Sequence, residues 1–238
     1  MKIENCMTPR LLAIADCVQE GSRLADVGTD HAYIPIYLAQ KGIIPSAVAM
    51  DINVGPIRRA QENIRKYHLE NQITTRLSDG LKELRPDEAD EIVIAGMGGI
   101  LICEILDAGR KHWQESCRFL LQPMTAAEEL RKFLENNGFC IEREALAAEE
   151  GKIYQIICAV RGNMHMNNEV DYYISPYLRE HRVPLTKQLT ERRIAEFEKM
   201  LDGLSKCDRA ETKEKYQYVK SLLEELYSVR EECETWQS

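Results

Sequence analysis

The sequence contains the stretch LADVGTDHAYIPIYLAQKG at residues 24–42, in which an apolar run leads through an acidic, glycine-containing turn into a helix-like segment. This order is typical of the first strand, loop and helix of an α/β protein that binds a nucleotide. Dinucleotide-binding turns continue with more glycines, because the pyrophosphate lies against a bare helix N-terminus. Asp30 and His31 occupy that turn here. Because a carboxylate repels phosphate, the loop disfavours a dinucleotide and favours a ligand that carries positive charge.

Strand-like and helix-like segments alternate outward from this stretch. The expected helices span residues 9–20, 32–40, 55–70, 98–113 and 126–138, and the expected strands span residues 23–27, 46–52, 73–79, 90–99 and 118–124. The first helix begins with a hydroxyl cap at Thr8 and a proline at its first position. Such alternation indicates a parallel sheet covered by helices on both faces.

Two more strand-like runs follow at residues 139–150 and 152–160, separated only by Gly151. A connection this short permits only antiparallel pairing. A parallel sheet that ends in an antiparallel hairpin resembles the arrangement of S-adenosylmethionine-dependent methyltransferases, whereas most NAD-binding domains end on a sixth parallel strand. The expected fold is therefore α/β, with a Rossmann-like class I methyltransferase sheet.

The composition changes after Gly162, where a polar, proline-containing segment follows. From Leu185 onward, apolar residues recur at helical spacing in two segments, and Asp208 is placed to cap the second. Two amphipathic helices with a short break predict a coiled-coil-like α-helical hairpin. The predicted domains are a methyltransferase domain at residues 1–162 and a helical domain at residues 163–238.

The composition narrows the class of protein. No apolar run in the 238 residues approaches the length of about 18 that a membrane span needs. No signal peptide is evident, and none of the eight cysteines forms a C-x-x-C pair or zinc-like cluster. These features predict a cytoplasmic protein without membrane or metal, and monomer is the default. The formal charge of −8 disfavours a broadly basic surface but allows a local basic patch.

Four consecutive strand ends carry residues that suit S-adenosylmethionine. Asp26 and Asp30 can attract its sulfonium and ammonium groups, and Gly28 leaves room for the ligand. Asp51 can accept hydrogen bonds from the ribose, and Asp79 can meet the adenine amino group. The stretch AGMGG at residues 95–99 leaves space for a flat ring. Each signal alone also fits a helix cap, a surface acid, a turn or a flexible loop.

These motifs together resemble one family. DVGTDHAYIPIYL, AMDIN, SDGL and IAGMGG look like the motifs of bacterial tRNA (adenine-22-N1)-methyltransferases, and the resemblance covers nearly the whole chain. It implies S-adenosylmethionine as the donor and N1 of an adenine in the D-arm region of tRNA as the acceptor. Asp30 is implied as the residue needed for activity. The implied cofactor residues are Asp26, Gly28, Asp30, His31, Asp51, Ile52, Asp79, Gly80, Ala95, Gly96 and Met97.

The absence of an N/D-P-P-Y motif fits this acceptor. Adenine N1 already has an in-plane lone pair, so the enzyme mainly has to expose and align it. Asp30 is expected to accept a hydrogen bond from the N6 amino group and to stabilise the positive charge that develops on the base. The target adenine must be unpaired or splayed out. Tyr33, Gly98 and Met97 are candidates for the slot that receives it, although Tyr33 also suits helix packing.

An acidic protein needs a local basic surface to hold tRNA. The helix at residues 55–70 offers Arg58, Arg59, Arg65 and Lys66, with further candidates at Lys2, Arg10, Lys187, Arg192 and Arg193. Each residue alone also fits a solvated surface charge. The C-terminal hairpin carries both signs and is interpreted as an arm that recognises shape, with a structural brace as the alternative.

Other functions remain open at this stage. A methyltransferase for a small molecule would use the helical hairpin as a lid, and a non-catalytic protein would use it to recruit a partner to a cofactor-binding scaffold. An NAD-dependent dehydrogenase is disfavoured by Asp30 in the phosphate position. A serine hydrolase lacks its G-x-S-x-G motif.

Overall fold

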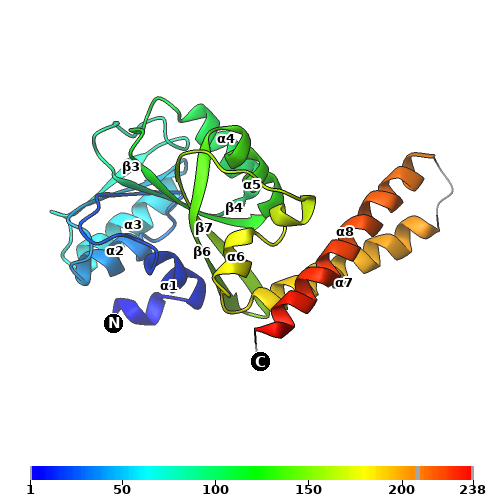
Figure 1. Cartoon of the computed structure of the whole chain (residues 1–238). Helices are drawn as coiled ribbons and strands as arrows, with labels where there is room; N and C mark the ends of the chain where they lie inside the picture. The colour runs from blue at the N-terminus through cyan, green and yellow to red at the C-terminus, as the bar shows by residue number, and fades with distance from the viewer. Residues whose placement is uncertain (1, 207–209, 237–238) are drawn as a thin grey trace. The chain divides into compact units, whose positions relative to one another are not determined.

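The structure is a computed structural model that describes residues 2–206 and 210–236. Its contacts divide the chain into two compact units, one ending at Met164 and one beginning at His165. Figure 1 shows the first unit as a sheet with helices and the second as helices only. The assignment of functional domains to residues 1–162 and 163–238 stays a prediction.

The strands and helices of the first unit follow one another as the sequence pattern predicts. Its strands are β1 (Leu24–Val27), β2 (Ala47–Asp51), β3 (Ile73–Leu77), β4 (Glu91–Gly98), β5 (Arg118–Thr125), β6 (Phe139–Glu149) and β7 (Lys152–Arg161). Its helices are η1 (Ile3–Cys6), α1 (Pro9–Ala15), α2 (Tyr33–Gln40), α3 (Val54–Lys66), α4 (Gly99–Ala108) and α5 (Ala127–Asn136).

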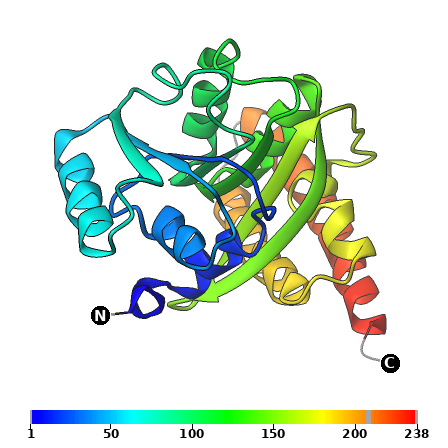
Figure 2. The same ribbon diagram turned by 90° about the vertical axis from the view of Figure 1, so that its left-hand side faces the viewer.

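The sheet has the strand order β3-β2-β1-β4-β5-β7-β6. Strands β1 to β5 pair in parallel, and β7 lies antiparallel between β5 and β6 (Figure 2). The expected fold class is confirmed. The order of the strands reverses between β1 and β4, so the carboxyl ends of these two strands border the crevice where α/β proteins bind ligands.

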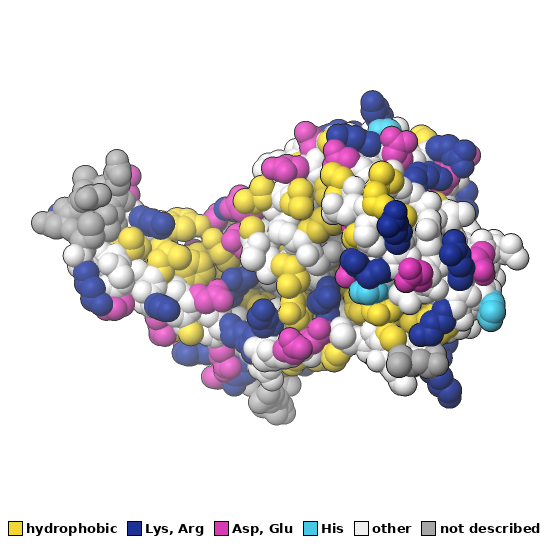
Figure 3. All heavy atoms as spheres, turned by 180° about the vertical axis from the view of Figure 1, so that it is seen from behind, with side chains coloured by type: hydrophobic (Ala, Val, Ile, Leu, Met, Phe, Trp, Pro, Cys, Tyr) yellow, Lys and Arg dark blue, Asp and Glu magenta, His cyan; other side chains and the backbone are white. Residues whose placement is uncertain are grey.

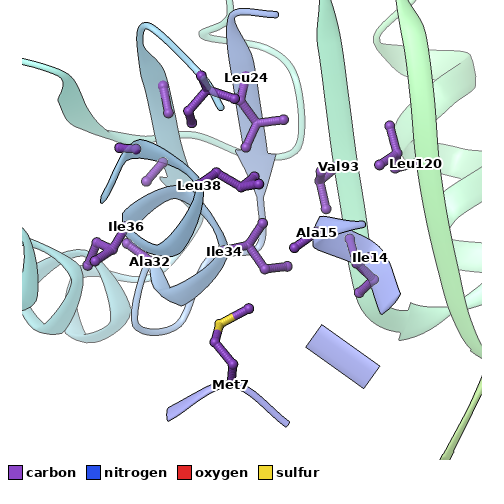
Figure 4. Close-up of a cluster of buried hydrophobic side chains, with 14 of the residues drawn as sticks. Met7, Ile14, Ala15, Leu24, Ala32, Ile34, Ile36, Leu38, Val93 and Leu120 are labelled. Atoms are coloured by element: carbon purple, nitrogen blue, oxygen red, sulfur yellow. The ribbon is translucent and has the colours of Figure 1, made fainter. Parts of the chain in front are cut away.

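Alternate residues of the central strands face two separate apolar cores. Leu24 and Val93 pack with α1 and α2, where Ile14, Ile34 and Leu38 complete the cluster (Figure 4). Their neighbours along the strands, including Ala25 and Ile92, join a second cluster with α4 and α5 on the opposite face. Every central strand is thus buried on both faces, which explains its nearly continuous apolar sequence.

Helix α1 begins where the sequence predicts but ends earlier. The Thr8 hydroxyl accepts a hydrogen bond from the Leu11 amide, with Pro9 at the first helical position. The helix ends at Ala15, not at residue 20, because buried side chains bind the next backbone groups. The Cys17 carbonyl accepts a bond from Arg118 at 2.6 Å, and the Gln19 amide donates to Glu91 at 3.1 Å.

The second unit consists of η2 (Glu169–Tyr172), α6 (Pro176–Glu180), α7 (Thr186–Ser205) and α8 (Ala210–Thr235). Helices α7 and α8 form the expected hairpin, with Leu189, Ile194 and Leu226 buried. Figure 3 shows further apolar side chains along this hairpin, among charges of both signs. Asp208, the expected cap, lies outside the described residues. Among the helices described, none has the length and apolar character to cross a membrane.

Candidate active site

A cavity of about 330 Å³ opens at the carboxyl ends of β1 and β4. It is formed by the start of α1, the loop after β1 and the end of β4. The lining residues are Arg10, Leu11, Asp26, Gly28, Thr29, Asp30, His31, Ala32, Tyr33, Ile34, Ala95 and Gly96. The structure therefore brings the predicted residues of the first loop together with Ala95 and Gly96 of the AGMGG stretch.

The loop after β1 is held in a compact turn by backbone hydrogen bonds. The amides of Gly28 and Thr29 both donate to the Met50 carbonyl, at 2.8 and 2.9 Å. The Thr29 hydroxyl accepts from the Ala32 amide at 3.1 Å, and Ala32 adopts a left-handed conformation at φ 55°. These bonds fix the loop to the end of β2 and lead the chain into α2.

Gly28 is required by both its conformation and its neighbour. Its φ of +81° lies in the left-handed region, and a Cβ atom added there would lie 2.0 Å from the Met97 methyl carbon. The backbone at Gly28 and the Met97 side chain are therefore in close contact. Met97, predicted as a cofactor or base contact, covers the first loop and does not belong to the cavity lining.

Asp26 is the buried acid of the site. It is the last but one residue of β1, and only 7% of it is exposed. Burial raises the pKa of Asp26 to about 6, partly opposed by a hydrogen bond from Thr29 and reinforced by the nearby charge of Asp51. None of these three influences is a cation, so a bound cation would stabilise the charged form of Asp26.

Asp30 lies at the mouth of the cavity with 59% of its side chain exposed. Its carboxylate forms an ion pair with Arg59 of α3 and lies 3.2 Å from His31 Nε2. His31 stacks on Tyr33, with ring centroids 4.9 Å apart. Arg59, which the sequence suggested for tRNA, thus reaches the predicted catalytic acid.

The ends of β2 and β3 form an open shelf beside the cavity, outside its lining. Asp51 accepts a hydrogen bond from the Asn53 amide at 2.7 Å, and Ile52 follows with 59% of its surface exposed. Asp79 is exposed and forms an ion pair with Lys82. Gly80 turns the chain at φ +58° against Ile105. The shelf thus presents two carboxylates and an apolar side chain in the predicted order.

Arg10 is a site residue that sequence reasoning placed elsewhere. The sequence pattern suggests Arg10 as a basic contact for tRNA, but the residue lines the cavity. Its Nη1 donates to Gln122 Oε1 at 2.8 Å, its guanidinium lies 5.5 Å from the centre of the Tyr154 ring, and Gln122 also accepts from the Gly96 amide at 3.1 Å. The one sequence signal for this placement is that Arg10 follows Thr8 and Pro9 at the start of a predicted helix.

Strand β4 continues past the end of β1 as a glycine-rich segment that stays paired with β5. Gly98 pairs with Thr125, and a Cβ atom added at Gly99 would lie 2.2 Å from the Ala126 carbonyl oxygen. The glycines therefore serve close backbone packing as well as ligand space. Gly98, predicted for the base slot, is the residue that precedes α4 and lies outside the cavity lining.

Of the other basic candidates, three lie along α3, Lys2 precedes η1, and Lys187, Arg192 and Arg193 lie on α7. Arg58, Arg65 and Lys66 are all exposed, and Lys66 lies over the Tyr67 ring.

Within residues 2–206 and 210–236, no three His, Cys, Asp or Glu side chains gather closely enough to hold a metal ion. The cavity therefore combines two acids, Asp26 and Asp30, with one arginine, Arg10, which suits a ligand with both positive and negative groups.

Comparison with known proteins identifies the family. The family described as "Methyltransferase domain" matches residues 7–157. The chain belongs to this methyltransferase family. It is 28% identical to the tRNA (adenine(22)-N(1))-methyltransferase of Bacillus subtilis over 94% of this chain and 96% of that protein.

Solved structures extend the likeness over both units of this methyltransferase. The crystal structure of the B. subtilis M1A22 tRNA methyltransferase TrmK has a TM-score of 0.85 and 29% identity, with 93% of this chain and 97% of that chain covered. Sp1610 of Streptococcus pneumoniae, in complex with S-adenosyl-L-methionine, has a TM-score of 0.82 and 31% identity, with 94% and 99% covered. The fold of this methyltransferase is thus that of TrmK.

Proposed function

We propose that this protein transfers a methyl group from S-adenosylmethionine to N1 of the adenine at position 22 of tRNA. The observation that carries the proposal is the first loop, where Asp26 and Asp30 stand at a cavity edge in place of a phosphate site. The likeness to the B. subtilis tRNA methyltransferase over both units supports the substrate. We propose that the protein acts on this substrate in the cytoplasm and as a monomer.

The residues present fit S-adenosylmethionine. Asp26, a buried acid, suits the ammonium group, and Arg10, which lines the same cavity, suits the carboxylate. Asp51 suits the ribose hydroxyls. At position 28, where the backbone contacts the Met97 side chain, no residue larger than glycine fits. When bound, the cofactor supplies a methyl group made electrophilic by its sulfonium.

Asp30 is the proposed catalytic residue. Adenine N1 attacks with its own lone pair, so no base is needed to activate it, and the ring becomes positively charged as the bond forms. Asp30, exposed at the mouth of the cavity, accepts a hydrogen bond from the N6 amino group, orients the ring and stabilises this charge. The ion pair with Arg59 positions the Asp30 carboxylate at the mouth of the cavity before the base arrives.

Basic side chains on α3 are proposed to contact the tRNA backbone. Arg58, Arg65 and Lys66 are exposed on the helix that also carries Arg59. Contacts with phosphates release counterions, so tRNA affinity is expected to fall steeply between low and moderate salt. A tRNA affinity that does not change with salt would contradict this surface.

Methyl transfer from labelled S-adenosylmethionine to unmodified tRNA, followed by nucleoside analysis, tests the function. The expected product is 1-methyladenosine, lost when adenine 22 is replaced by guanine. The Asp30→Ala variant is expected to lose turnover by at least about a hundredfold, with cofactor affinity within a few-fold of wild type. Asp107→Ala, which removes an exposed acid at the far end of α4, is the control.

The outcomes separate the alternatives. Cofactor binding without label in tRNA, but with label in a metabolite, would establish a small-molecule methyltransferase. Cofactor binding without any transfer would establish a scaffold. An equal loss of turnover and cofactor affinity in Asp30→Ala would make Asp30 a cofactor ligand only.

A further inference from the structure

Exposed apolar side chains gather at one edge of the sheet. Of the eight large apolar side chains that are exposed among the described residues, six lie at or just after the carboxyl ends of β2, β3, β4 and β5. Single exposed apolar residues are ordinary on a protein surface, but a group at one edge indicates a binding surface.

These six side chains fall on two sides of the cavity. Ile52, Val54 and Leu77 lie beside the acids of the β2–β3 shelf. The other three are Ile100 and Leu101 in the first turn of α4 and Met124 near the end of β5, exposed by 59%, 46% and 43%. We call these three residues the apolar rim.

Backbone pairing and hydrogen bonds tie the two segments of the apolar rim together. Gly98 pairs with Thr125, and the backbone at Gly99 lies against the Ala126 carbonyl, so the residues that precede Ile100 contact those that follow Met124. The two chain segments that carry the apolar rim are therefore adjacent at the carboxyl ends of β4 and β5.

The apolar rim also adjoins the cavity. The Met124 sulfur lies 3.6 Å from Gln122 Nε2. The Oε1 atom of the same Gln122 accepts from the Gly96 amide and from Arg10, which both line the cavity. If the N1 atom of the target adenine enters the cavity, the nucleotides on either side of it in the RNA chain would thus lie close to the apolar rim.

Extrusion of a base gives such a surface a physical role. Adenine N1 lies on the Watson–Crick edge, so the base must leave its stack, which costs the energy of unstacking and unpairing. The bases on either side then expose their faces. Apolar side chains that pack against those faces offset part of the cost, as inserted apolar side chains do in nucleic acids that proteins kink.

We propose that the apolar rim, Ile100, Leu101 and Met124, packs against the nucleobases that flank the target adenine and thereby holds that adenine extruded. The inference rests on the proposed function and adds the part of the tRNA that this edge recognises. Its occupant is RNA because the apolar rim is continuous with the cavity that receives the reacting base.

The test compares two substrates with one pair of variants. Ile100→Ser combined with Met124→Ser removes the apolar contact, and Ile100→Leu, which keeps it, is the matched control. On tRNA with a stacked target, kcat/KM of the double variant is expected to fall by about tenfold or more. On a tRNA fragment in which the target adenine is already unstacked, the loss is expected to stay within about threefold. S-adenosylmethionine affinity, measured by calorimetry, is expected to stay unchanged.

A fluorescent base supplies a second readout. With 2-aminopurine beside the target adenine, wild-type protein is expected to change the fluorescence on binding, and the double variant is expected to lose this change. An equal loss on both substrates, or no loss on either, would overturn the proposal. Failure of the wild type to methylate any tRNA would instead overturn the proposed function.

Discussion

Gly28 and Asp26 are single residues of the cavity lining whose conformation or burial is unfavourable to the folded state. Gly28 adopts a conformation that other residues avoid, directly under the Met97 side chain. Burial raises the pKa of the Asp26 carboxyl to about 6. Neither feature is needed to pair β1 with its neighbours, so we attribute both to the proposed binding of the cofactor.

Gly28→Ala is expected to destabilise the protein through two separable effects. The left-handed conformation costs about 1–2 kcal/mol for alanine, and the new methyl group must also displace the Met97 side chain. Met97→Ala in the same chain is expected to remove the second effect and leave the first. Urea unfolding of the two single variants and the double variant measures both. Strict additivity would contradict the contact.

Asp26→Asn is expected to stabilise the protein in a pH-dependent way. The pKa of Asp26 rises from 3.8 to about 6 on folding, so the folded state favours the protonated form. The free energy of unfolding of the wild type therefore falls as pH rises from about 4 through 6, by about 1.4 kcal/mol for each pH unit that separates the unfolded and folded pKa values. Asp26→Asn has no carboxyl to titrate at this position, so its free energy of unfolding does not fall in this way.

The comparison is made by urea unfolding without cofactor at pH 5 and pH 8. The advantage of Asp26→Asn over wild type is expected to be larger at pH 8, reaching about 3 kcal/mol at most. The variant is also expected to bind S-adenosylmethionine at least about tenfold more weakly, because the ammonium loses its counter-charge. The same advantage at both pH values would contradict the titration of Asp26.

At the scale of elements, one buried ion pair joins α5 to the antiparallel hairpin. Arg131 and Glu144 are 0% and 1% exposed at their side chains, and their atoms lie 2.6 Å apart. Arg131 also donates to Gln155 of β7 at 2.9 Å. These contacts attach α5 to the two strands that distinguish this sheet from a fully parallel one.

Arg131→Met is expected to cost about 3–5 kcal/mol, because it leaves the Glu144 charge buried without its arginine. Arg131→Met combined with Glu144→Leu is expected to be more stable than either single variant, since no charge remains buried. Thermal unfolding checks the order of the three variants. A double variant that is the least stable would show that the pair contributes net stability. Cofactor affinity is expected to stay near wild type in every variant that folds.

At the scale of the whole molecule, the chain divides between a unit with the cavity and a unit of helices. The first unit buries both faces of its sheet within residues up to Met164. The second unit has its own core, with Ile174, Leu178 and Leu222 buried. Two separate cores allow separate roles, and we assign cofactor binding to the first unit and tRNA recognition to both.

A chain that ends at Met164 is expected to fold and to bind S-adenosylmethionine within about threefold of wild type, because the proposed ligand residues all lie in the first unit. Its methylation of tRNA is expected to fall by at least about tenfold, through a weaker tRNA affinity. Circular dichroism, calorimetry and the transfer assay measure the three properties. Full activity of the shortened chain would reduce the helical unit to a brace.

The sequence alone determined the order of the elements and the positions of the acids. Alternating strands and helices, with a final pair separated only by Gly151, required a parallel sheet that ends in an antiparallel hairpin, because local spacing governs which pairings the chain can reach. The sequence likewise predicted that Asp26, Asp51 and Asp79, which lie at or near the ends of three successive strands, share one edge of the sheet.

Only the tertiary structure decided which side chains meet there. It brought Arg10 into the cavity, paired Arg59 with Asp30 and ended α1 at Ala15. These results depend on residues far apart in the chain, such as Gln122 for Arg10 and Arg118 for the end of α1. Local patterns specify the backbone of an element, whereas its partners are set by long-range packing and by the need to satisfy buried polar groups.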